Sequence, residues 1–90
     1  MEEVEYRQKK MDELINSFME FCCNIENKNE GITTFILNNT KYKQYENLCN
    51  DLYFKGDYIE FISRLNDMRG IWMNNITIFN KRQKELVNGN

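Results

Sequence analysis

Large apolar side chains recur at intervals of seven residues through the last third of this chain. They are Tyr58, Leu65, Trp72, Phe79 and Leu86, and Phe61 with Met68 form a companion line. This spacing places side chains on one face of an α-helix, whereas a half-buried strand would show strict alternation. The repeat passes through Gly70, which costs a helix about 1 kcal/mol relative to alanine and allows a kink. We predict one helix over about residues 57–87, with an apolar face that must be covered.

The first third of the chain has the same period. Its apolar positions are Val4, Met11, Phe18 and Ile25, flanked at helical spacing by Leu14 with Phe21 and by Ile15 with Cys22. This stripe predicts an amphipathic helix over about residues 2–27. Acidic residues in its first turn suit the positive end of the helix dipole. The segment NKNEG that follows contains Asn and Gly, which commonly end helices.

The segment ITTFILNNTKYKQ between these two stretches fits more than one structure. Its Ile, Thr and Phe residues favour a strand by propensity, but a single strand would have no partner in this chain. As a helix, the segment keeps most of its large apolar side chains on nearly one face. We predict a second helix over about residues 32–55 with a break allowed at 38–39, while helix, strand and loop all stay open for residues 32–40.

Gly56 and Asp57 predict a short turn between the second and third helices. Gly permits the left-handed conformation that ends a helix, and Asp caps the start of the next one. The turn GDY resembles that of a tetratricopeptide repeat over residues 45–68, but Phe61 stands where that family packs a small residue, and the chain has no second copy. We therefore expect a single all-α domain over residues 1–90, an up-down-up bundle of three helices, two of them long.

The composition excludes several kinds of chemistry. The absence of His removes His-based catalytic triads, general bases and zinc ligand sets. Cys22 and Cys23 are adjacent and so point about 100° apart on a helix, and with Cys49 they lack the paired spacing of a zinc site. The four glycines are isolated, so they form no phosphate-binding loop. We predict that the chain is not an enzyme and takes no metal or cofactor.

Cysteine usage and hydropathy indicate the compartment. An odd number of cysteines without an apolar leader sequence is typical of a reducing, cytoplasmic setting with free thiols. The longest apolar runs have about six residues, against the roughly 18 that a membrane-spanning helix needs. We therefore expect a cytoplasmic protein without a membrane partner.

Charge is distributed unevenly along the chain. Residues 1–30 hold eight acidic against four basic residues, whereas residues 61–90 hold five basic against two acidic ones. A small acidic chain without catalytic equipment is typical of inhibitors that phages encode against host defence enzymes, in the manner of anti-CRISPR proteins. Our leading hypothesis is a non-catalytic protein-binding module that occludes a larger partner, such as a basic nucleic-acid-binding enzyme, in the host cytoplasm.

The acidic face of the first helix is the predicted partner-binding surface. Its residues are Glu2, Glu5, Asp12, Glu13 and Glu20. Two other hypotheses stay open: a small structural subunit of a large assembly, and a nucleotide or nucleic-acid binder formed by an oligomer. For the latter, Lys41 and Lys43 alternate with Tyr42 and Tyr45, a combination that can hold phosphate and stack bases. The sequence pI of 5.1 is opposite to the usual footprint of nucleic-acid-binding proteins.

The predicted third helix is longer than the second helix can cover. Its far half presents four apolar residues at helical spacing: Trp72, Ile76, Phe79 and Leu86. Because large exposed apolar patches usually mark an interface, we expect a homodimer in which these residues of two chains pack together. The competing interpretation is that Trp72 is a core residue of the monomer.

Overall fold

The computed structural model describes the backbone of residues 2–88 and the side chains of residues 3–86. It contains four helices, α1 (Glu2–Lys28), α2 (Ile32–Leu37), α3 (Thr40–Lys55) and α4 (Tyr58–Asn88). No strand occurs within residues 2–88, which confirms the all-α class. The helices there number four instead of the predicted three, because α2 is separate from α3. None of them is long and apolar enough to cross a membrane.

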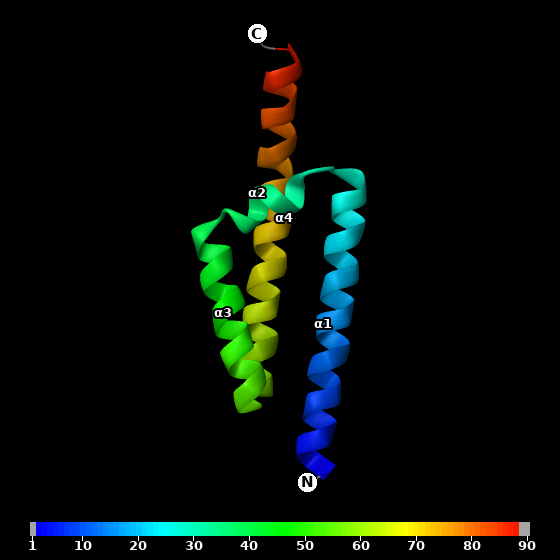
Figure 1. Cartoon of the computed structure of the whole chain (residues 1–90), viewed down its shortest axis with the longest axis vertical. Coiled ribbons are helices and arrows are strands. Elements are labelled where there is room, and N and C mark those ends of the chain that lie inside the picture. Colours follow the sequence, from blue (N-terminus) through cyan, green and yellow to red (C-terminus); the bar gives the residue numbers. More distant parts are fainter. Residues whose placement is uncertain (1, 89–90) are drawn as a thin grey trace.

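α4 is the central element of the molecule, and the other three helices pack against it (Figure 1). α1 and α4 run in the same direction, while α3 lies on the other side of α4 and runs the opposite way. α1 and α3 have few contacts with each other, so they flank α4 without closing over it. The result is a flat rod that measures 60 × 22 × 15 Å along its principal axes.

The apolar face of α4 forms the middle of the core. The buried side chains are Phe61, Leu65, Met68, Trp72 and Phe79 from α4, Met11 and Phe18 from α1, Ile32 and Ile36 from α2, and Tyr42, Cys49 and Leu52 from α3. α4 continues through Gly70 as one helix. Its seven-residue repeat is covered as far as Phe79, but Leu86 at the far end is exposed. α4 therefore extends beyond the helices that cover it.

α2 forms from the segment whose residue types favour a strand. Ile32 and Ile36 lie one helical turn apart, and both side chains are fully buried. This burial decides the conformation, because strand propensity is easily overridden by tertiary packing. Asn39 then begins α3, since its side-chain oxygen accepts a hydrogen bond from the Tyr42 N–H at 2.9 Å. α2 and α3 thus separate at 38–39, where the sequence allows a break.

Two residues connect α3 to α4. Gly56 ends α3 in the left-handed conformation, with φ of 74°, and the Asp57 N–H donates to the Leu52 carbonyl at 3.0 Å. The Asp57 carboxylate accepts a long hydrogen bond from the Glu60 N–H at 3.4 Å, which caps the start of α4. This short turn aligns α3 and α4 as an antiparallel hairpin (Figure 1).

Candidate functional site

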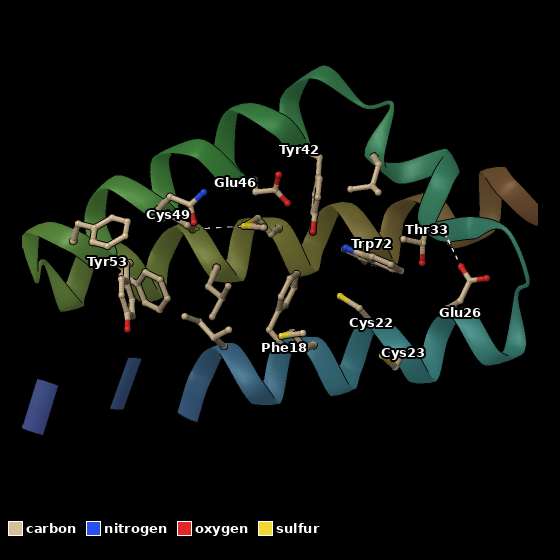
Figure 2. Close-up of a pocket in the computed structure, with 18 of the residues that line it drawn as sticks. Phe18, Cys22, Cys23, Glu26, Thr33, Tyr42, Glu46, Cys49, Tyr53 and Trp72 are labelled. Atoms are coloured by element: carbon tan, nitrogen blue, oxygen red, sulfur yellow. Dashed lines mark hydrogen bonds between the residues drawn. The ribbon is translucent and has the colours of Figure 1, made fainter. Parts of the chain in front are cut away.

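A groove runs along the rod between α1 and α3, and α4 forms its floor (Figure 2). Its volume is about 600 Å³, which is in the range of ligand-binding sites in proteins. The lining is mainly apolar and aromatic, with Phe18 from α1, Tyr42 and Tyr53 from α3, and Phe61 and Trp72 from α4. The groove exists because α1 and α3 both pack on α4 but scarcely on each other. It is a part of the core that the helices leave open.

Two polar links define the ends of the groove. At one end, the Glu26 carboxylate of α1 accepts hydrogen bonds from the N–H groups of Gly31 and Thr33, at 2.7 and 2.8 Å, and so fixes the start of α2. At the other end, the Tyr53 hydroxyl of α3 donates to Asp12 of α1 at 2.7 Å. Along α1 these links are about 14 residues apart, or roughly 21 Å at about 1.5 Å per residue.

Tyr42 and Trp72 place polar atoms deep in the groove. Figure 2 shows the two side chains pointing toward one another, and their ring centroids lie 6.4 Å apart in an edge-to-face arrangement. Burial raises the pKa of the Tyr42 hydroxyl to about 12, so it stays protonated at neutral pH. The Trp72 indole N–H is buried and close enough to the Tyr42 hydroxyl to lower the pKa of that hydroxyl, but it forms no hydrogen bond of good geometry within the described part of the chain. An acceptor that reached this N–H would gain the hydrogen bond that the free protein lacks.

Two of the cysteines that line the groove, the half-buried Cys22 and the buried Cys49, have raised thiol pKa values. Burial raises the pKa of Cys22 to about 12 and that of Cys49 to about 11. The Cys49 thiol also lies 3.5 Å from the Met68 sulfur. Because only the thiolate is an effective nucleophile or metal ligand, neither cysteine is prepared for such chemistry at neutral pH. Among the described side chains, no cluster of three His, Cys, Asp or Glu could hold a metal ion.

The charged side chains that line the groove are both acidic. They are Glu26 and Glu46, and none of the described residues that line the groove is basic. Hydrogen bonds from the N–H of Gly31 and from Thr33 lower the pKa of Glu26, which keeps it ionised. Glu46 lies on the groove side of α3 (Figure 2) and forms no ion pair with the residues described. Arg64 and Arg69, whose charges act on the Cys49 and Cys22 thiols, lie outside the lining. The two carboxylates of the lining itself favour a positively charged occupant.

The predicted partner-binding residues are spread along the outer side of α1. Glu5 and Glu20 are exposed, and Glu13 pairs with Lys10 at 3.5 Å. Asp12 is the one that reaches α3, through its hydrogen bond with Tyr53. The side chain of Glu2 lies outside the described residues. Asp12 thus contacts Tyr53 of the groove wall without being part of the lining, and the other described carboxylates of this set are exposed.

The predicted self-association residues have mixed surroundings. Trp72 and Phe79 are buried by their own chain, with 2% and 7% of their surface exposed, and Ile76 is half-buried. Leu86 is exposed. The structure therefore places Trp72 in the core of a single chain, at the floor of the groove. Homodimer formation stays a prediction, and Leu86 is the residue of this set that is most available to a second chain.

The tyrosines considered for base stacking are occupied within the chain. Tyr42 is buried against Trp72, and Tyr45 is half-buried beneath Lys41 and Arg64, whose cationic groups each lie 5.8 Å from its ring centroid. The Tyr42 ring is therefore withdrawn from solvent, and the Tyr45 ring is partly covered by these two cations.

Comparisons with known proteins supply no relative from which a function could be carried over. No family model, no curated protein and no solved structure matches this chain. The functional proposal therefore rests on the groove and on the charges around it.

Proposed function

We propose that this chain is a non-catalytic protein-binding module, and that its groove receives an amphipathic helix from a larger partner. The observation that carries the proposal is an open apolar groove of about 600 Å³ whose only charged lining residues are carboxylates. Helix-in-groove recognition uses a few apolar anchors at spacings of three, four and seven residues. The groove offers such anchors a row of aromatic and aliphatic side chains, from Phe61 at one end to Trp72 near the other.

The occupant is a basic helix. Its apolar face enters the groove, and its Lys or Arg side chains flank that face and meet Glu46 and the acidic end at Glu26. The interval of roughly 21 Å between the two polar links accommodates about four helical turns. A second copy placed groove to groove would instead bring these carboxylates together, and like charges oppose such pairing. A foreign basic helix is therefore favoured over self-pairing at this surface.

Binding of this kind inhibits a partner that needs the same helix for its own activity. The acidic flank of α1, with Glu5, Asp12, Glu13 and Glu20, continues the negative field beyond the groove and suits a target whose surface is basic, such as a nucleic-acid-binding enzyme. Free cysteines accord with action in the cytoplasm, that of the host if a phage encodes the protein. The absence of His and the protonated thiols support a role in binding instead of catalysis.

Trp72 provides a direct test, because it is the only tryptophan and it lies in the groove. The probe is a synthetic amphipathic peptide of about 14 residues, with Leu at the anchor positions and Lys elsewhere. We expect it to change the fluorescence of Trp72 on titration. The same peptide with Glu in place of Lys should bind much more weakly.

A matched pair of variants tests whether the groove carboxylate matters. Glu46→Lys should weaken binding of the basic peptide about tenfold at low salt, whereas Asp51→Lys makes the same charge change on α3 away from the groove and should have a small effect. Equal losses in the two variants would mean that only net charge matters and would overturn the proposed site. Binding of a neutral apolar small molecule without any response to the basic peptide would overturn the helix as occupant.

A further inference from the structure

The large apolar side chains that the chain leaves most exposed lie at the two ends of the rod. At one end are Phe54, Ile59, Val4 and Tyr6, with 85%, 79%, 64% and 62% of their surface exposed, and at the other is Leu86, with 78% exposed. Figure 1 shows the start of α1 and the α3–α4 turn at one end, and the end of α4 at the other. Large apolar side chains that a chain leaves this exposed are a common feature of interfaces.

Both ends also contain a stretch of helix that nothing covers. Residues 3–9 of α1 and residues 80–86 of α4 are exposed at every position. The last tertiary contacts described for α4 are those of Phe79 and Arg82 with the Phe35 ring, at 5.6 and 5.1 Å. Helices in proteins owe most of their stability to packing. Packing against a partner would therefore stabilise these two exposed helix ends.

At each end of the rod one helix projects beyond its neighbours and forms a step, which we call a ledge. α1 extends beyond the α3–α4 turn at one end of the rod, and α4 extends beyond α2 at the other (Figure 1). Consider a second copy that is displaced along the long axis of the first. The projecting α4 of the second copy would then lie beside the projecting α1 of the first copy and against the α3–α4 turn of the first copy. The projecting helix of one ledge can therefore lie beside the projecting helix of the other.

The charges at the two ledges are opposite. The projecting part of α4 holds Lys81, Arg82 and Lys84 against one carboxylate, that of Glu85. We call this the basic end. The other ledge holds the first turns of α1 and α4 and the end of α3. Its carboxylates are Glu3, Glu5, Asp57 and Glu60, and its cations are Arg7, Lys9 and Lys55, with Arg7 paired to Glu3 at 2.9 Å. Four carboxylates against three cations leave a net negative charge, and we call this ledge the acidic end. Contact between two basic ends would be repulsive, whereas contact between a basic and an acidic end would be attractive.

We propose that the chain associates with further copies of itself head to tail, with the basic end of one copy on the acidic end of the next. Leu86 then packs among the exposed side chains of Phe54, Ile59 and Val4. Because the two surfaces differ, each copy keeps one free surface of each kind, and the association is open-ended instead of closing as a dimer. This surface is separate from the α1–α3 groove except at Phe54, which also lines the groove.

Sedimentation of the full-length chain tests the proposal. The weight-average mass should rise steadily above the 11.0 kDa of the monomer, without a plateau at the dimer, between about 10 µM and about 1 mM protein. Raising NaCl from about 50 mM to about 500 mM should weaken the association about tenfold, because the contact joins exposed opposite charges. A monomer over this whole range would overturn the proposal.

Two blocked variants distinguish head-to-tail association from a symmetric dimer. Phe54→Gln combined with Ile59→Gln blocks the acidic end, and Leu86→Gln blocks the basic end. Each alters exposed side chains and should stay folded but monomeric. An equimolar mixture should form a one-to-one dimer and stop there, because one intact surface of each kind remains. Met73→Gln, at an exposed position in the middle of α4, is the control and should associate like the natural chain. Two results together would overturn the proposal in favour of a symmetric interface. The natural chain would form a closed dimer, and the mixture of the two blocked variants would stay monomeric.

Discussion

Trp72 on α4 is both a core residue and a part of the groove floor. It is almost fully buried, with its ring against Tyr42, and it also forms part of the groove floor. Its indole N–H faces the Tyr42 hydroxyl without a hydrogen bond of good geometry to any described residue, which costs free energy in the unoccupied protein. The side chain nevertheless fills a large volume in a core that has only about a dozen buried members, so its packing dominates.

Replacement of Trp72 should therefore unfold the monomer. Trp72→Ala leaves a large cavity between α3 and α4 and should lower the free energy of unfolding by about 3 to 5 kcal/mol. Met73→Ala, at the exposed neighbouring position, should change it by less than about 0.5 kcal/mol. Urea denaturation followed by circular dichroism measures both values. A Trp72→Ala protein that is folded but dissociated would show instead that the residue belongs to a dimer interface.

The raised pKa of the half-buried Cys22 thiol predicts a loss of stability at alkaline pH. Burial raises the pKa of Cys22 from its ordinary value of 9.0 to about 12 in the folded chain, so above pH 9 the unfolded chain releases a proton that the folded chain retains. The free energy of unfolding should be constant near pH 8 and should fall as the pH rises through 9 toward 11. Cys22→Ser should remove the contribution of this thiol to the slope, whereas Cys23→Ser should reduce the slope less, because burial contributes more than Cys23 to the raised pKa of Cys22. An identical slope in both variants would assign the effect to other groups.

Among the elements, the junction between α2 and α3 depends on a single cap. The Asn39 side chain satisfies the Tyr42 N–H at the start of α3. Asn39→Ala should lower the free energy of unfolding by about 1 kcal/mol, whereas Asn38→Ala, at an exposed position without a described side-chain hydrogen bond, should have little effect. Thermal or urea denaturation compares the two. Equal effects would show that the loop conformation matters here and the cap does not.

The long helices could be predicted from sequence because their information is local. Val4, Met11, Phe18 and Ile25 define α1 by period alone, and the repeat through Trp72 does the same for α4. α2 is different, because its six residues are too few for a period and their propensity favours a strand. Only the burial of Ile32 and Ile36 against α4 decides that segment, and burial is not visible before the helices are assembled.

The groove could not be predicted from the same patterns. Tyr42, Cys49 and Trp72 have the spacing of core residues. They are buried within the chain, and they also line the groove. Whether α1 and α3 also close over them depends on where each helix lies around α4, which the period of a helix does not specify. One signal was present: Phe54 is a large aromatic residue outside the apolar face of α3. Such residues indicate surfaces that the monomer does not cover.

For the whole molecule, the acidic flank of α1 should control how fast a basic partner associates. Glu13→Lys combined with Glu20→Lys reverses exposed charges on the outer side of α1. This change should slow association with a partner captured by the natural chain and should remove the salt dependence of the rate. Glu85→Lys, at the opposite end of the rod, is the control. Stopped-flow mixing gives the rates, and unchanged kinetics would confine the contact to the groove.

The separation of α1 from α3 also has a consequence for hydrogen exchange. α3 and α4 are joined by a two-residue turn and pack along their length, whereas α1 is held on one side by α4 and by the two polar links at Asp12 and Glu26. α1 can therefore detach while the α3–α4 hairpin stays intact. Amide protons of α1 should exchange with deuterium well before those in the middle of α4. Because the same detachment removes one wall of the groove, a bound helix should slow exchange in α1 most of all.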